Sequence, residues 1–156
     1  MLRQRTWILL GLTLLLQTAI TLVLLKLPEP ADIFRIQTSF TLESFERVLA
    51  GWNAANRQTF LLHYAFDFFY PWAYGFFFYF LLEDLPGLSR FKYLALLAGL
   101  CDELENALHF LLVNGNIGLQ PSAIFAAGLF SSAKWLLVVY LSALVFSKCR
   151  PLGRMK

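Results

Sequence analysis

The sequence predicts an all-α fold, a polytopic membrane protein with a four-transmembrane-helix bundle and an extracytoplasmic amphipathic helix. Residues 1–156 form a single membrane domain. Hydrophobic residues make up 58% of the chain, above the roughly 45–50% of a typical soluble domain. Four apolar runs approach the length of about 20 residues that crosses a bilayer, and basic residues cluster at their ends, which is a topology signal. The runs cover residues 7–25, 60–82, 91–113 and 122–146.

The first span, residues 7–25, carries no charged side chain and follows a short basic segment. A secretory signal peptide has a similar start, but its apolar region is shorter and ends at a small-residue cleavage site. Here Lys26-Leu-Pro-Glu-Pro30 follows the apolar run. We therefore expect an uncleaved helix, whose Thr13, Gln17 and Thr21 share the side that faces the bundle.

An amphipathic helix is predicted over residues 41–57. Thr41 is a suitable N-cap and Glu43 falls in the first turn. Apolar residues recur at helical spacing, namely Leu42, Phe45, Val48, Leu49 and Trp52. The helix is expected either to lie in the membrane interface or to cap the mouth of the bundle.

The second span, residues 60–82, carries a polar stripe. His63, Asp67, Tyr70 and Tyr74 follow one another at i, i+4, i+7 and i+11, so they share one face of a helix. Pro71 frees a backbone carbonyl and can kink the helix, which membrane proteins tolerate when a neighbour bonds that carbonyl. Hydrogen-bonded packing and a functional site both account for the stripe.

The third span, residues 91–113, carries a second stripe. Asp102, Glu105, Asn106 and His109 fall at i, i+3, i+4 and i+7. An ionisable group at membrane depth costs roughly 2.5 to 3.5 kcal/mol on insertion scales and indicates a functional site by default. The alternative is a polar seam that joins helices. Glu103 lies off the stripe and faces either the cavity or a neighbouring protomer.

The fourth span, residues 122–146, places Lys134 near its middle, followed by Trp135. Counted from the outer ends of antiparallel helices, Asp102 and Lys134 lie at similar depth and can pair. By the same count, the His63 and Asp67 pair is level with the pair formed by Glu105 and His109. The sequence therefore predicts a polar cavity in the outer half of the bundle, lidded by the amphipathic segment.

The basic residues predict the orientation. Four spans place both termini and the loop of residues 83–92 on one side, with eight basic residues against four on the other. The positive-inside rule puts the richer side in the cytoplasm, so a multi-pass protein of the cell inner (plasma) membrane is expected, with cytoplasmic N- and C-termini. The eight are Arg3, Arg5, Arg90, Lys92, Lys148, Arg150, Arg154 and Lys156.

The side chains of the cavity favour proton transfer. Asp67 and Glu105 are the acid/base candidates, with His63 or His109 assisting, because a buried carboxylate beside a histidine can shuttle a proton. These four side chains also offer nitrogen and oxygen ligands for a metal. Neither a His-Glu-x-x-His element nor paired Glu-x-x-His motifs occur, so no metal ligand is assigned and no cofactor is identified. The remaining candidates contact a ligand: Tyr70, Tyr74, Asp102, Asn106, Lys134 and Trp135.

Two patterns carry resemblances. Asp67-Phe-Phe-Tyr70-Pro71 together with Asp102-Glu-Leu-Glu105-Asn106 resembles a pattern in small, uncharacterised bacterial four-helix membrane proteins, which implies an architecture and no activity. The order of a first helix, an outer amphipathic segment, an acidic-then-proline second helix and two more helices resembles the EXPERA group. That group includes sterol isomerases and the sigma-2 receptor, so the resemblance implies binding of sterol-like amphiphiles among intramembrane acids.

The expected function is the binding of a small amphiphilic or lipid-like molecule. Proton transfer by the cavity side chains could also isomerise or otherwise transform that molecule. A proton- or ion-coupled transport component, gated by Lys134 and Asp102, is one alternative, and a structural membrane subunit is another. The sequence leaves open whether the protein is an enzyme. Membrane lipid is the expected partner, and a homo-oligomer is left open. The chain has no Gly-rich phosphate loop and no nucleic-acid motif, so no nucleic acid is expected.

Overall fold

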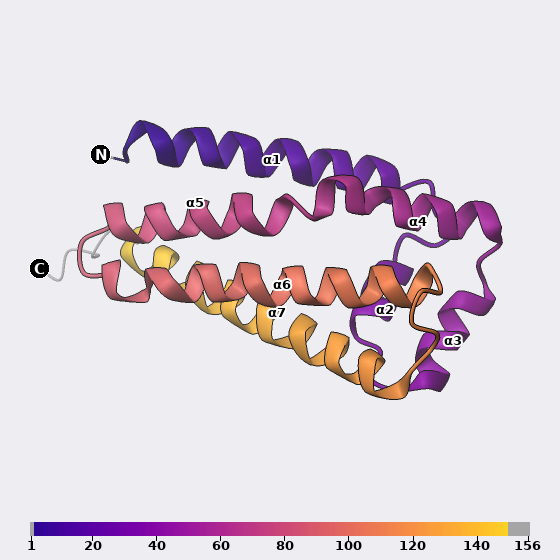
Figure 1. The fold of residues 1–156 in the computed structure, drawn as a ribbon. Helices are drawn as coiled ribbons and strands as arrows, with labels where there is room; N and C mark the ends of the chain where they lie inside the picture. The colour runs from indigo at the N-terminus through magenta and orange to yellow at the C-terminus, as the bar shows by residue number, and fades with distance from the viewer. Residues whose placement is uncertain (1, 150–156) are drawn as a thin grey trace, which may run out of the picture.

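The computed structural model describes residues 2–149, which form helices and no strand. The predicted all-α class is therefore confirmed. The basic residues Arg150, Arg154 and Lys156 lie outside the described part. Long helices run side by side along one axis, with two short helices at one end (Figure 1). The elements are α1 (Gln4–Leu24), α2 (Asp32–Gln37), α3 (Leu42–Ala50), α4 (Ala54–Asp67), α5 (Tyr70–Asp84), the 3₁₀ turn η1 (Ser89–Phe91), α6 (Lys92–Val113) and α7 (Pro121–Cys149).

The long helices pack in a definite order. α1 packs against α4 and α5, α5 packs against α6, and α6 packs against α7. α4 continues into α5 along nearly the same line, so the two together run the length of the molecule beside α1 and α6 (Figure 1). α1 and α7 are therefore the outer members of the arrangement.

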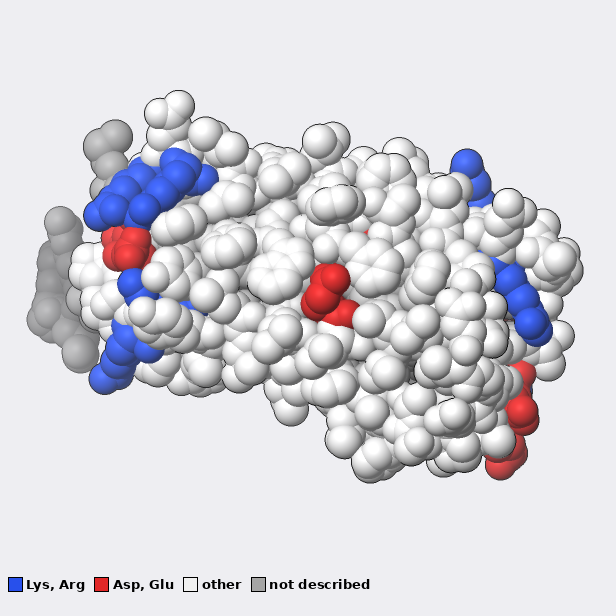
Figure 2. Space-filling model, in the orientation of Figure 1, with Lys and Arg blue, Asp and Glu red and all other residues white. Residues whose placement is uncertain are grey.

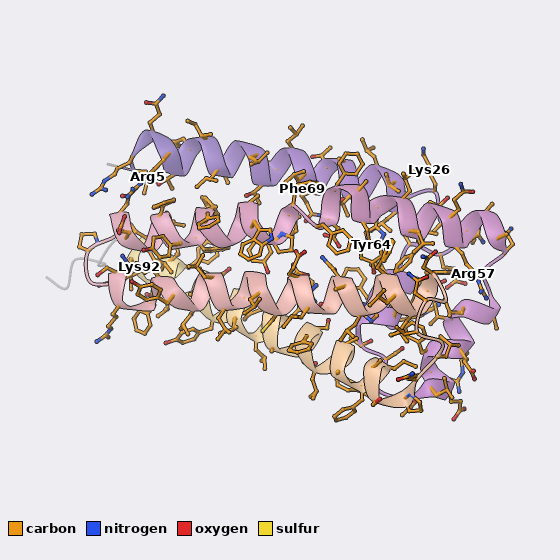
Figure 3. All side chains as sticks on the ribbon, in the orientation of Figure 1. Arg5, Lys26, Arg57, Tyr64, Phe69 and Lys92 are labelled. Atoms are coloured by element: carbon orange, nitrogen blue, oxygen red, sulfur yellow. The ribbon has the colours of Figure 1, made fainter. Side chains whose placement is uncertain are left out.

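The prediction of a single helix over residues 60–82 is wrong in one respect, because the helix is interrupted at Phe68 and Phe69. Figure 3 shows Phe69 at the interruption. Pro71 has no N–H with which to bond the carbonyl four residues earlier, that of Asp67. That carbonyl instead accepts a hydrogen bond from the Asn106 side-chain amide of α6, at 3.1 Å. A neighbouring helix thus bonds the carbonyl that the proline leaves free.

The predicted amphipathic helix is shorter than residues 41–57. α3 ends at Ala50, and Asn53 begins the next helix by accepting a hydrogen bond from the Asn56 N–H. The expected N-cap is confirmed, because Thr41 Oγ1 accepts from the Ser44 N–H and Ser44 Oγ accepts from the Thr41 N–H. The two hydrogen bonds satisfy N–H groups that a helix start otherwise leaves unpaired.

The short helices cover the end of the bundle where α6 finishes. The Phe45 ring of α3 stacks on the His109 imidazole of α6, with 6.0 Å between centroids. Trp52 follows α3 and donates its indole N–H to the buried Asp32 carboxylate of α2 at 2.8 Å. This hydrogen bond joins the two ends of the α2–α3 segment, residues 32–52. α7 approaches the same segment so closely that a Cβ on Gly128 would lie 2.8 Å from the Ser39 carbonyl oxygen. The α2–α3 segment is therefore packed firmly on α6 and α7.

Two described helices are long and apolar enough to cross a membrane by themselves, namely α1 and residues Pro121–Lys148 of α7. The interruption divides the second predicted span into α4, of 14 residues, and α5, of 15. α6 has 22 residues but carries three carboxylates. Charged side chains gather at the two ends of the molecule and leave a broad uncharged belt, in which one acidic patch shows on the viewed face (Figure 2).

One end of the belt is held by ion pairs that link the start of α1 to the end of α5. Asp84 accepts hydrogen bonds from the Arg3 backbone N–H and the Thr6 hydroxyl, each at 2.9 Å. Glu83 pairs with Arg5 and accepts a hydrogen bond from Lys92 at 2.9 Å. Arg5 and Lys92 lie near one another at this end, opposite Lys26 and Arg57 (Figure 3). The first, fifth and sixth helices are thus joined where their ends meet.

Candidate functional site

A groove of about 250 Å³ lies between α1 and α7, and its charged and histidine side chains come from α4, α6 and α7. Apolar and aromatic side chains line most of it, and several polar side chains converge within it, as in many small-molecule sites. Its lining comprises Thr13, Gln17, Ile20, Leu24, Ile33, Phe34, His63, Asp67, Tyr70, Tyr74, Phe77, Phe78, Asp102, Lys134, Trp135 and Val138.

The exposed lining residues show where the groove opens. Gln17 of α1, Phe34 of α2 and Trp135 of α7 are exposed, the last two by 59% and 45%. Gln17 and Trp135 lie on the outer helices and Phe34 lies on α2, whereas His63 and Asp102 are buried. The groove therefore opens sideways between α1 and α7, and the α2–α3 segment covers the end of the bundle.

A buried cluster of three charged groups lies at the inner wall of the groove. Lys134 Nζ is 2.6 Å from Asp102 Oδ1 and 2.7 Å from Glu105 Oε2. All three side chains are buried, and removing ions from water costs several kcal/mol per ion unless they pair closely. The separation of three residues on α6 puts both carboxylates on one face, where a single ammonium reaches both.

His63 and Asp67 of α4 form a second polar pair in the groove. His63 Nε2 lies 3.5 Å from Asp67 Oδ2, and the opposite ring nitrogen, Nδ1, contacts the Phe60 carbonyl oxygen. A carbonyl oxygen only accepts, so Nδ1 carries a proton. The separation of 3.5 Å is longer than the roughly 2.6–3.2 Å of direct proton transfer, and the Asp67 side chain is 13% exposed. The pair can therefore serve general acid–base chemistry only through a bridging water or after a small movement of either side chain.

The predicted residues divide into two groups. Seven line the groove together: His63, Asp67, Tyr70, Tyr74, Asp102, Lys134 and Trp135. The other three, Glu105, Asn106 and His109, are buried on α6 and are not part of the lining. Glu105 contacts Lys134, and His109 Nδ1 lies 3.7 Å from Glu105 Oε1. Tyr74 lines the groove and donates its hydroxyl to the Ala98 carbonyl oxygen at 3.0 Å.

Sequence reasoning missed several lining residues. Phe77 and Phe78 continue the stripe of Asp67, Tyr70 and Tyr74 by one helical turn, so periodicity alone could have found them. Ile33 and Phe34 of α2 carry no such signal, because only the tertiary packing brings this short helix beside α1. Glu103 is absent from the lining. Among the residues that the structure describes, no three His, Cys, Asp or Glu side chains are placed to hold a metal.

A second hollow, of about 480 Å³, lies between α2 and α3. Its charged groups are already paired, since Arg35 contacts Glu29 at 2.6 Å and Asp32 at 2.8 Å, and Arg47 contacts Glu43 at 2.8 Å. The hydroxyls of Thr38 and Ser39 donate to backbone carbonyls of α2. The groove between α1 and α7 is therefore the better candidate site.

The fold and the groove define the class of this protein as an all-α bundle with two helices long and apolar enough to cross a membrane and a mostly apolar lateral groove that contains several polar side chains. No protein-family model, curated protein or solved structure matches the chain.

Proposed function

We propose that this protein crosses the membrane four times and binds a small amphiphilic or lipid-like molecule in the groove between α1 and α7. The observation that carries the proposal is the composition of the groove, in which buried polar groups lie between apolar walls that open sideways. An amphiphile matches both surfaces, because its polar head can bond the inner groups while its apolar part stays among hydrocarbon side chains.

The lengths of the helices support four crossings. α6 has 22 residues and spans about 33 Å at about 1.5 Å per residue, close to the roughly 30 Å of a hydrocarbon core. α4 and α5 run end to end and together exceed that length. Asp102 and Glu105 are buried and pair with Lys134, which is how charged residues are accommodated at membrane depth.

The proposed location follows from the charges at the two ends. The end with Arg3, Arg5, Arg90 and Lys92 is placed in the cytoplasm, together with both termini, and the α2–α3 segment on the opposite side. The protein is then a multi-pass protein of the inner (plasma) membrane. The groove opens within the uncharged belt, so its ligand enters from the lipid.

Within the groove, the polar head of the ligand is placed near Asp67, Asp102 and Lys134. Tyr70, Tyr74 and Trp135 supply flat faces beside it. Asp67 is the acid/base candidate, because its carboxylate lines the groove and has His63 beside it. Glu105 and His109 do not line the groove and influence the ligand indirectly, through the contact of Glu105 with Lys134. Isomerisation or another proton-transfer reaction of the ligand is the chemistry that these groups serve.

A second candidate is a proton- or ion-coupled transport component. The observation that favours it is a row of buried ionisable groups on adjacent turns of α6, comprising Asp102, Glu105 and His109, with Lys134 against the first two. Such rows occur in proton relays. A relay predicts pH-coupled flux in vesicles that is lost in Asp102→Asn, whereas an amphiphile-binding protein shows none.

The test is native mass spectrometry with lipid analysis of the detergent-purified protein. Wild type, Asp67→Asn and Glu103→Gln are compared at matched thermal stability. Glu103→Gln is the control, because it removes a carboxylate of α6 that does not line the groove. We expect a co-purified amphiphile in wild type and in the control and its loss in Asp67→Asn. Equal occupancy in all three, or none in any, contradicts a ligand site at the groove.

A further inference from the structure

The interruption between α4 and α5 is a feature that the proposed function leaves unexplained. Asp67 is the last residue of α4, and Tyr70 is the first of α5. Both side chains line the groove, one on each side of the interruption. The direction of these two side chains therefore depends on how the interruption is held.

α6 holds the interruption at two points. Asn106 donates its side-chain amide to the Asp67 carbonyl oxygen at 3.1 Å, and the Asn106 side chain is buried. About two turns away, the backbones of α5 and α6 touch, since a Cβ on Gly99 would lie 2.8 Å from the Pro71 carbonyl oxygen. The backbone on both sides of the interruption is thus fixed against a single neighbouring helix.

The Asn106 hydrogen bond has a chemical reason to be there. Pro71 cannot bond the Asp67 carbonyl, and a carbonyl that is shielded from water destabilises the fold unless another donor reaches it. Asparagine is short enough to keep the helices close and still offers an amide donor. One N–H of its amide is used on the backbone, and Asn106 is not part of the groove lining.

We propose that Asn106 is the positioning residue of the groove: by bonding the Asp67 carbonyl it fixes the interruption that directs Asp67 and Tyr70 into the ligand site. This inference rests on the proposed function for its binding readout. It differs from a purely structural role, because another way of satisfying the same carbonyl should restore stability without restoring the direction of the side chains.

Pro71→Ala supplies that other way. Alanine has a backbone N–H that can bond the Asp67 carbonyl and continue the helix through residues 68 and 69. In the double variant Pro71→Ala/Asn106→Ala the carbonyl is satisfied within the helix and the interruption is removed. Stability and side-chain direction are then separated in one protein.

The experiment measures melting temperature, binding of a dansyl-labelled long-chain alcohol, and a distance across the interruption. The distance is taken between spin labels at Leu62 of α4 and Phe76 of α5, both exposed, so it needs no ligand. Wild type, Asn106→Ala and the double variant are compared. Leu104→Ala is the control, because Leu104 lies on α6, is 40% exposed and is absent from the groove lining.

Asn106→Ala is expected to lower the melting temperature, broaden the distance distribution and weaken probe binding about tenfold. The double variant is expected to recover the melting temperature, with a narrow but shifted distance and binding that stays weak. Recovery of wild-type distance and binding in the double variant overturns the inference. An unchanged distance in Asn106→Ala also overturns it. If wild type does not bind the probe while the distances behave as expected, the proposed function fails for this probe and the positioning role stands.

Discussion

Lys134 of α7 reaches across to α6 and places its ammonium nitrogen 2.6 Å from Asp102 Oδ1. The same nitrogen lies 2.7 Å from Glu105 Oε2, so one cation serves two buried carboxylates. Because these groups are far from water, the pairing contributes to how α6 and α7 are held together and not only to the site. This dual role can be measured.

Replacing Lys134 by methionine keeps the volume of the side chain but leaves two carboxylates without their cation. Breaking a buried ion pair in this way typically costs about 3–5 kcal/mol in the free energy of unfolding. We expect a loss of that order in Lys134→Met, measured by denaturation in detergent. Adding Asp102→Asn and Glu105→Gln should recover much of it. A single variant as stable as wild type would contradict the contribution assigned to the pair.

Gly99 of α6 should be hard to replace, as should Gly128 of α7, whose Cβ would also lie 2.8 Å from a backbone carbonyl oxygen. A Cβ on Gly99 would meet the Pro71 carbonyl oxygen at 2.8 Å, which is too close without a backbone shift. Overpacking of this kind costs about 1–3 kcal/mol, so Gly99→Ala should lower the melting temperature in detergent. Gly11 of α1 is the matched control, because nothing lies within 4 Å of its Cβ position. Gly11→Ala should be neutral or stabilising, and equal losses at both positions would contradict the close packing.

The ion pairs at the end of α5 predict a dependence on pH. The hydrogen bond from Lys92, together with the pairing to Arg5, lowers the pKa of the Glu83 carboxyl. A group whose pKa is lowered by folding stabilises the folded state above its unfolded pKa, near 4.3, and loses that contribution as the pH falls through the folded pKa. Melting temperature should therefore fall in the acidic range below about pH 4.3. Glu83→Gln should lower it at pH 7 and flatten this part of the profile, and an identical profile in the variant would argue against the assignment.

The proposed topology can be checked by cysteine labelling in intact cells. In a background lacking Cys101 and Cys149, Arg47→Cys on α3 should react with a membrane-impermeant maleimide. Arg90→Cys, in the turn between α5 and α6, should react only after lysis. Labelling of both sites from the same side would contradict the single crossing that is proposed between them.

The sequence identifies the polar stripes because a helix repeats at a known interval. The stripe from His63 to Tyr74 lies in the groove as predicted even though the helix is interrupted, since the two pieces remain nearly in line. The pairing of Lys134 with Asp102 was predicted from depth alone, and the structure confirms it. Counting residues from the ends of antiparallel helices is enough for such a pair.

Other features depend on tertiary contacts that no period reveals. Pro71 signals a free carbonyl, but only the structure shows that Asn106 bonds it. The helical period places Asn106 on the polar stripe and predicts a ligand contact, and the structure adds its hydrogen bond to the backbone. The seating of α3 on α6 also depends on packing, since the Phe45 ring stacks on the His109 imidazole.

The attachment of α1 has a consequence for biosynthesis. Arg3 and Arg5 find their partners 78 to 81 residues later in the chain, at Glu83 and Asp84. On the proposed insertion, α1 enters the bilayer long before those partners emerge from the ribosome. Its long apolar sequence makes α1 stable in the bilayer as an isolated helix, because every backbone group between its ends is hydrogen-bonded within the helix. The completed α5 then recruits a helix that is already in the bilayer, so the α1 wall of the groove is made first but joins its partners only after α5 is made.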